Sequence, residues 1–268
     1  WRAVAAGELE AEGALPRLLQ KAGIDPARFG TGKAKTIDSL LKEVQKGEST
    51  LEWQEQSWSL RRMAEPVFIQ FRWRSRVLVE VEQRFQDGRT RQRNMLMAEK
   101  KSPEDPDVKA TALRGIREEL NLPAEFPPLT QAVHFMQEAY CCVAETLESS
   151  SYPGLACVYV THYCGVQLTE AGMSHFRALG MLEDEFETQE SDKVNRWRWM
   201  PLEEARKSKV KGFPVLKEPT ASGEDKEVVW EPLTSVPLDA ASLRVLLEVG
   251  GVNVKAWGEY APASLRSL

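Results

Sequence analysis

The spacing of large hydrophobic residues divides the chain into a helical part and a part built mainly from strands. Up to about Ala64 these residues recur at helical spacing, as Leu15, Leu18 and Leu19 do. Beyond that point they recur at every second position, which is the period of a β-strand. We therefore expect a helical N-terminal extension over residues 1–64, followed by a domain that contains a sheet.

Capping residues mark the ends of helices in two places. The hydroxyl of Thr36 can cap a helix that ends near Gly47. Near the middle of the chain, Asp105-Pro106-Asp107 combines acidic residues with a proline, as the first turn of a helix does. Asn121 and Pro123 are stop signals for that helix. A central helix between these signals is therefore expected.

Two strand-like runs, at residues 67–73 and 77–81, predict either a hairpin or one long bent strand. In the hairpin, a three-residue connection centred on Arg76 would set Arg72 opposite Glu80 as a cross-strand ion pair. The dipeptide Asp87-Gly88 is a clearer turn signal and leads into a third strand. Later strands are expected at residues 129–135, 141–147 and 155–166, and a helix at 169–182.

The central helix has an apolar stripe and a polar face. The stripe consists of Leu113, Ile116 and Leu120, and the opposite arc carries Arg114, Gly115, Glu118 and Glu119. Two adjacent carboxylates therefore leave the helix beside an arginine. A glycine inside a helix costs about 1 kcal/mol relative to alanine, so we expect a close neighbour or a ligand to require the space at Gly115.

Residues 114–122 resemble the second half of the Nudix box, whose family pattern there is R-E-U-x-E-E-x-G-U, with U an aliphatic residue. The matching positions are the arginine Arg114, the aliphatic residues Ile116 and Leu122, and the glutamate pair Glu118 and Glu119. The same pattern on an amphipathic helix also arises as an ordinary solvated face with an ion pair four residues apart.

The resemblance has two departures within this half of the box. Gly115 stands where the family has its first glutamate, which is a metal ligand and in some members the general base, and Asn121 stands where it has glycine. The glycine and glutamate of the first half would fall in register on Lys100 and Pro106. The nearby carboxylates that a loop of different length would bring into that place are Glu104 and Asp105.

A second resemblance lies at residues 196–204, Arg-Trp-Arg-Trp-Met-Pro-Leu-Glu-Glu. Nudix domains commonly finish with a strand that carries a tryptophan and a helix that opens with a P-L-x-E-like turn. The order of these elements over residues 65–209 implies an α/β (α+β) fold, a Nudix-like α/β/α sandwich with a mixed sheet. Residues 210–268 are expected to form an irregular C-terminal arm with a short helix.

The resemblance implies a metal-dependent hydrolase of a nucleoside diphosphate linked to another moiety. Such chemistry uses Mg²⁺ or Mn²⁺ to neutralise phosphate oxygens and to activate the attacking water. Glu118 and Glu119 would hold the metal, and Arg114 would orient the cluster. In many relatives a carboxylate outside the box completes the metal site, and the acidic segment 183–187 offers Glu185 for this role.

A second hypothesis is a Nudix-fold protein that hydrolyses nothing and serves as a binding module or a structural subunit of a larger assembly. Gly115 removes one carboxylate from the expected metal cluster, and eight tryptophans are present. The N-terminal extension and the C-terminal arm exceed what an enzymatic core requires. We expect these extensions to wrap the core, to form a homodimer or to bind a partner protein.

Composition and charge narrow the kinds of function and the cellular compartments that we expect. The net charge of −5 argues against a general nucleic-acid binder. No apolar run reaches the length of about 18 residues that a membrane span requires, so a soluble protein is expected. The first residues do not resemble a signal peptide, and the four cysteines lack the spacing of a secreted disulfide framework. These features favour a reducing compartment, either the cytoplasm or the interior of an organelle.

Overall fold

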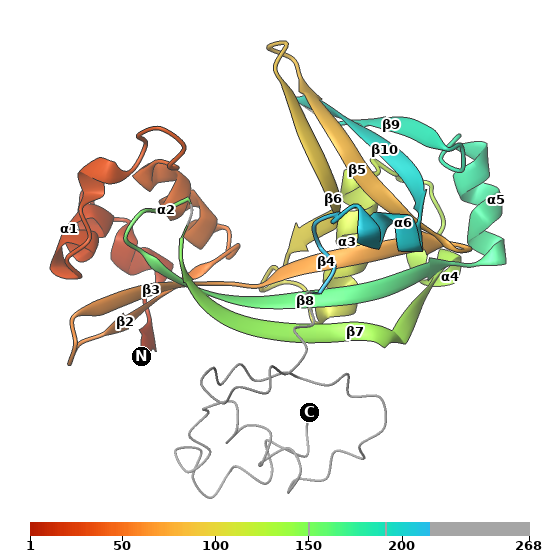
Figure 1. Ribbon diagram of the computed structural model, residues 1–268. Helices are drawn as coiled ribbons and strands as arrows, with labels where there is room; N and C mark the ends of the chain where they lie inside the picture. Colours follow the sequence, from red (N-terminus) through yellow and green to blue (C-terminus); the bar gives the residue numbers. More distant parts are fainter. Residues whose placement is uncertain (150, 191, 215–268) are drawn as a thin grey trace, which may run out of the picture. The chain divides into compact units, whose positions relative to one another are not determined.

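One mixed, open sheet runs through the structure, a computed structural model that describes residues 1–149, 151–190 and 192–214 (Figure 1). Its strands in these ranges are β1 (Arg2–Ala3), β2 (Thr50–Gln54), β3 (Ser59–Ala64), β4 (Pro66–Trp73), β5 (Arg76–Phe85), β6 (Thr90–Lys100), β7 (Val133–Glu148), β8 (Ala156–Leu168), β9 (Glu185–Gln189) and β10 (Lys193–Pro201). They follow the order β1-β2-β3-β8-β4-β6-β5-β10-β9, and β7 also pairs with β8. Strand β8 runs parallel to β3 and β4, whereas the other pairs are antiparallel.

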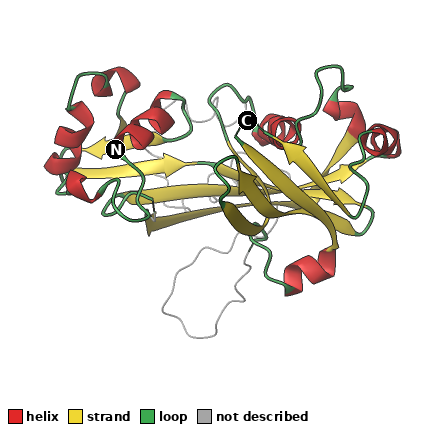
Figure 2. Cartoon of the chain, turned by 90° about the horizontal axis from the view of Figure 1, so that it is seen from above, coloured by secondary structure: helices red, strands yellow, loops and turns green. Residues whose placement is uncertain are grey.

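Helices cover both faces of the sheet, which confirms the expected α+β class. The helices in the described ranges are α1 (Ala14–Lys21), α2 (Ile37–Gln45), α3 (Val108–Glu119), α4 (Leu129–Ala132), α5 (Glu170–Ala178) and α6 (Leu202–Lys207), with short 3-10 helices at Ala6–Leu9 and Pro26–Arg28. Helices α3 and α5 lie on one face and α6 lies on the other (Figure 2). None of the described helices is both long and apolar enough to cross a membrane.

The main hydrophobic core lies between the sheet and α3. Ile116 of α3 and Leu120, the C-cap residue that follows the helix, are fully buried in a cluster with strand residues that include Ile69 and Trp197. Trp197 is one of the two tryptophans expected near the end of the domain, and its indole donates a hydrogen bond to Thr188. Burying side chains of this size contributes about 2 to 3 kcal/mol each, so this core fixes α3 on the sheet.

The N-terminal region combines helices with a hairpin. Its helices end with α2, and the chain then forms β2 and β3, so the expectation of a helical segment is wrong for residues 50–64. These strands lie in the main sheet, because β3 pairs with β8. The region has its own hydrophobic cluster, which Tyr152 and Leu155 from the β7–β8 connection complete. A long-range pairing of this kind leaves no local signal in the sequence.

The β4–β5 connection is tighter than the sequence indicated. Arg72 pairs in register with Val77, so the predicted ion pair between Arg72 and Glu80 is wrong. Arg72 donates to Gln70 instead, and Glu80 accepts from Arg93 on the neighbouring strand β6. A two-residue turn at Arg74 and Ser75 replaces the three-residue turn centred on Arg76, so the partner of Arg72 moves by three positions, from Glu80 to Val77.

The end of α2 packs directly on the loop that precedes α3. Gly47 adopts a φ of +68°, and a Cβ at this position would lie 2.5 Å from Cδ of Pro103. Beside it, Glu48 accepts an ion pair from Lys100 at 2.7 Å. The N-terminal region therefore reaches the part of the chain that carries the box-like helix.

We predict that Gly47→Ala lowers the free energy of unfolding by more than Gly23→Ala. Both glycines follow a helix with a positive φ, but a Cβ at Gly23 would meet nothing within 4 Å. Gly23→Ala is the control, and backbone strain alone should lower its free energy of unfolding by about 1 kcal/mol. Gly47→Ala should lower the free energy of unfolding by about 1 to 3 kcal/mol more than the control does, because the contact of its Cβ with Pro103 is also too short. Equal losses in chemical denaturation of the two variants would contradict this packing.

Candidate functional site

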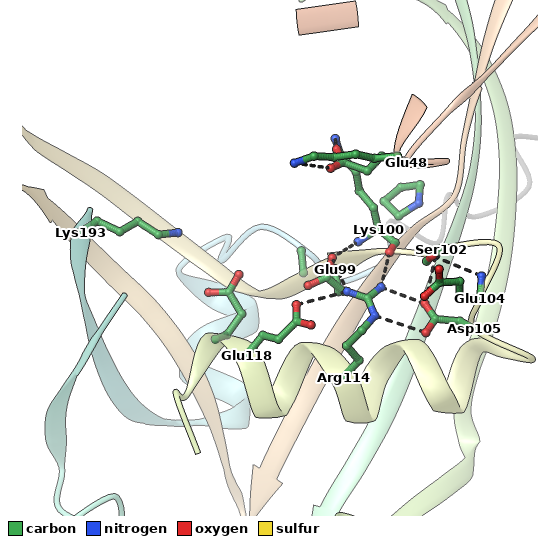
Figure 3. A pocket seen from close by; sticks show the side chains of 13 residues that line it. Glu48, Glu99, Lys100, Ser102, Glu104, Asp105, Arg114, Glu118 and Lys193 are labelled. Atoms are coloured by element: carbon green, nitrogen blue, oxygen red, sulfur yellow. Dashed lines mark hydrogen bonds and ion pairs between the residues drawn. The ribbon is translucent and has the colours of Figure 1, made fainter. Parts of the chain in front are cut away.

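The polar face of α3 opens onto a pocket of about 860 Å³ (Figure 3). Strand β6, the loop before α3, the end of α2 and the start of β10 complete its wall. The carboxylates that line it are Glu48, Glu99, Glu104, Asp105, Glu118 and Glu119. The cations are Lys46, Lys100, Arg114 and Lys193. The expected residues Arg114, Glu118 and Glu119 therefore share one pocket.

Helix α3 ends where the sequence predicted, but it begins at Val108, so Asp105-Pro106-Asp107 precedes the first turn and Asp107 is its N-cap. Asp107 caps it by accepting a hydrogen bond from the amide of Ala110 at 2.8 Å. Asn121 follows the last turn with a φ of +47°, which ends the helix. Ile116 is buried in the core, whereas Glu118 and Glu119 line the pocket. The capping signals and the apolar stripe thus determine which side chains face the pocket.

Arg114 is the centre of the polar contacts in this pocket (Figure 3). It donates to Asp105 at 2.8 Å and to the backbone carbonyl of Lys100 at 2.7 Å. Its Nη1 also lies 3.3 Å from Glu99 and 3.3 Å from Glu118. The guanidinium thereby joins strand β6, the loop before α3 and the helix itself. This arrangement supports a positioning role for Arg114.

Asp105 is the loop carboxylate that pairs with Arg114. It also accepts hydrogen bonds from the hydroxyl of Thr111 and from the amide of Ser102, each at 3.0 Å. The pair with Arg114 and these hydrogen bonds hold the pKa of Asp105 at about 2, below its usual value of 3.8. Of the two loop carboxylates considered from the sequence, Asp105 occupies the place beside the arginine, one position before Pro106. Glu104 lines the pocket and forms no ion pair with any described residue.

Gly115 lies against strand β6, as its position inside the helix suggested. A Cβ at Gly115 would lie 2.9 Å from Cβ of Glu99 and 3.1 Å from Cδ1 of Ile69. Glu99 is therefore the close neighbour that requires the space. Burial raises the pKa of the Glu99 carboxyl, and Arg114 opposes this rise. No local sequence pattern indicated that Glu99 belongs to the site, because it precedes Gly115 by 16 positions on a different element.

Glu119 is the less exposed carboxylate of the glutamate pair on α3. Burial raises the pKa of its carboxyl to about 7, and Lys193 opposes the rise, while Glu190 and Glu80 add to it. The amide of Asn195 donates to Glu119 at 3.4 Å. Glu119 is thus a desolvated carboxylate for which a proton or a cation is favourable.

Two buried oxygens near Glu119 have no hydrogen-bond partner among the described residues. They are Oε1 of Glu80 and Oδ1 of Asn195. Both residues are almost completely buried, with exposed fractions of 4% and 0%. Unpartnered buried acceptors are unfavourable, so the surroundings of Glu119 include two oxygens whose burial is not offset by a hydrogen bond.

Glu185 lies outside this pocket. It is on β9, where it pairs in register with Arg198 and forms ion pairs with Arg196 and Arg198. Its neighbour Glu187 pairs with Arg84. The acidic segment 183–187 is therefore engaged by arginines of adjacent strands, and the structure does not bring it together with Glu118 and Glu119.

The donor chemistry of the pocket fits a divalent cation such as Mg²⁺ or Mn²⁺. Carboxylate oxygens are the ligands these ions prefer, and six carboxylates face only four cationic side chains. The described residues contain no group of three or more acidic, histidine or cysteine side chains already gathered as metal ligands. Arg114 holds several of the carboxylates instead, so metal binding would require side-chain rotation.

Comparisons with known proteins assign no family. No family model matches the chain, and no curated protein matches it. Conclusions about function therefore depend on the pocket itself.

We predict that Asp105→Asn lowers the free energy of unfolding by about 2 kcal/mol at pH 7. The folded-state pKa of Asp105 is depressed, so its contribution is present above pH 4 and is lost as the pH falls through about 2. The difference in free energy of unfolding between the parent and the variant, measured by urea denaturation, should therefore shrink as the pH falls from 4 to about 2. Glu104→Gln in the same loop is the control and should change stability little. A difference that does not depend on pH would contradict the role of the ion pair.

Proposed function

We propose that the protein is a Nudix-type, metal-dependent hydrolase of a nucleoside diphosphate linked to another moiety. The observation that carries this proposal is the convergence of Arg114, Glu118 and Glu119 on one pocket. The rest of the chain lends support, since strands precede and follow the box-like helix in the expected order. An α+β fold with a mixed sheet is also what such a hydrolase requires.

The charge of the pocket favours a metal requirement. With six carboxylates and four cationic side chains, the lining carries a formal excess of negative charge. A diphosphate is itself an anion, and like charges in a partly desolvated pocket repel each other. A divalent cation at the carboxylates offsets this repulsion, so the pocket fits an anionic ligand together with a metal better than an anionic ligand alone.

The residues of α3 have separate roles in this proposal. Glu118 and Glu119 hold the cation through their carboxylate oxygens. Arg114 does not contact the ligand but fixes the geometry, because it ties α3 to Asp105 and to the carbonyl of Lys100. The bound cation supplies neutralisation of phosphate oxygens and a lowered pKa for the attacking water.

A second candidate is a Nudix-fold module that binds a nucleotide-like ligand or a partner protein without hydrolysis. Two observations about the carboxylates favour it. Helix α3 has no carboxylate at Gly115, and Arg114 already contacts the carboxylates of Glu99 and Glu118. In this case the guanidinium would take the place of the metal as the local positive charge. The two candidates differ in turnover.

The test measures release of phosphate or nucleotide from a panel of nucleoside diphosphate derivatives, with Mg²⁺ and with Mn²⁺. The parent chain is compared with the double variant Glu118→Gln, Glu119→Gln. Loss of one residue that only supports a metal ligand typically reduces metal affinity or activity by 10- to 100-fold. Loss of two direct ligands should therefore reduce turnover by more than about 100-fold.

A matched control is the double variant Glu203→Gln, Glu204→Gln. These adjacent glutamates lie in the first turn of α6, on the opposite face of the sheet, and should leave turnover unchanged. Absence of turnover in the folded parent chain with every substrate and both metals would refute the hydrolase proposal and favour the binding module. Equal turnover in the parent and the α3 variant would place the metal elsewhere.

A further inference from the structure

We propose that two copies of this chain pair through the outer edge of β7 and form one continuous sheet across a two-fold axis. The strand that occupies this edge is β7 of the second copy, which runs antiparallel to the first. Strand β7 contributes no lining residue to the pocket, so the contact does not depend on the proposed function. Each copy supplies the same edge, as a two-fold contact requires.

Strand β7 is long and has a neighbouring strand on one side only. It spans Val133–Glu148 and pairs antiparallel with β8, and no other strand in the described part of the chain pairs with it (Figure 1). A register shift between Met136 and Cys141 interrupts the strand, and the pairing is regular over residues 141–148. The side chains of residues 144–148 are exposed. The amides and carbonyls that point away from β8 here are therefore available to another strand.

The two ends of the sheet are protected against such pairing, whereas β7 is not. Strand β1 is only two residues long, and β9 has five residues that include Glu185 and Glu187, both paired with arginines. Short edges, charged residues and prolines are the usual means by which proteins prevent strand addition. Residues 141–148 contain no lysine, arginine, proline or glycine. This segment thus lacks most of the features that keep an edge unpaired.

The segment carries apolar side chains that a partner strand would bury. Leu147 is 50% exposed, although it is a large hydrophobic residue. Val143 and Cys141 share a face of the strand with it, because side chains at every second position point to the same side. Removal of this apolar surface from water stabilises the contact. The edge therefore favours a partner strand that has apolar side chains at matching positions.

A register centred on Ala144 makes β7 complementary to itself. A two-fold axis perpendicular to the sheet keeps each face continuous, so residues of the same face lie opposite each other. With Ala144 on the axis, the opposing pairs are Cys141 and Leu147, Cys142 and Thr146, and Val143 and Glu145. Each Leu147 then meets an apolar side chain of the other copy, and no carboxylate in these pairs faces a carboxylate. A register centred on Glu145 would set two carboxylates opposite each other, which is unfavourable.

The experiment measures the oligomeric state of the full chain by sedimentation velocity at protein concentrations from about 1 µM to about 500 µM. The parent chain should shift from monomer to dimer within this range, because an interface made mainly by one pair of strands is small. Ala144→Lys sets two ammonium groups opposite each other on the axis and should weaken dimerisation by at least about tenfold. Ala178→Lys makes the same change at an exposed alanine of α5 and should leave dimerisation unchanged.

Amide hydrogen exchange over residues 141–148 is the second measurement. In the parent chain, exchange should slow as the protein concentration rises, because the outward amides become paired in the dimer. The Ala144→Lys variant should exchange at the rate of the dilute parent at every concentration up to the point where it dimerises. Thermal melting of dilute protein verifies that both variants fold.

A dimer that Ala144→Lys weakens and Ala178→Lys does not would support the inference. A dimer that both variants form equally well would overturn it, as would a parent chain that stays monomeric with fast exchange. Protection of residues 141–148 in a monomer would mean that the edge is covered within one copy, which also overturns it. Growth beyond the dimer contradicts a two-fold contact, because that contact closes when two edges meet. None of these outcomes depends on turnover.

Discussion

The arrangement of the pocket depends on the contacts of one guanidinium. Arg114 joins the loop carboxylate Asp105, the end of β6 and helix α3, with two contacts shorter than 3 Å. Charge-assisted hydrogen bonds of this kind are stronger than neutral ones, and a planar fork of donors fixes direction as well as distance. Because Arg114 sits on α3, it sets the position of the helix and of the carboxylates beside it.

Close approach of α3 to β6 is the second constraint. It requires a residue without a side chain at Gly115, and it gives the strand residue Glu99 access to the pocket. The same constraint extends to the N-terminal region, where Gly47 lets the end of α2 contact the loop before α3 and brings Lys46 to the pocket wall. The pocket is therefore a product of three packed segments that are distant in sequence.

Several features of this protein were determined by local sequence. Capping by Asp107 and the αL residue Asn121 bound α3, and Thr36 caps α2, because these interactions involve residues two to four positions apart. Hydrophobic spacing predicted α3 and β4, and the Asp87-Gly88 turn signal predicted β6. The placement of Arg114, Glu118 and Glu119 on one polar face followed from the helical period alone.

Other features were decided only by tertiary structure. The length and place of the β4–β5 turn moved the partner of Arg72 from Glu80 to Val77, and Glu80 instead accepts from Arg93. Pairing of β3 with β8 drew residues 50–64 into the sheet. Strand neighbours also directed Glu185 to Arg196 and Arg198, away from the pocket. Glu99 entered the pocket because β6 packs against α3. Such contacts join residues far apart in the chain, and their free energy depends on how whole elements pack, which no local pattern records.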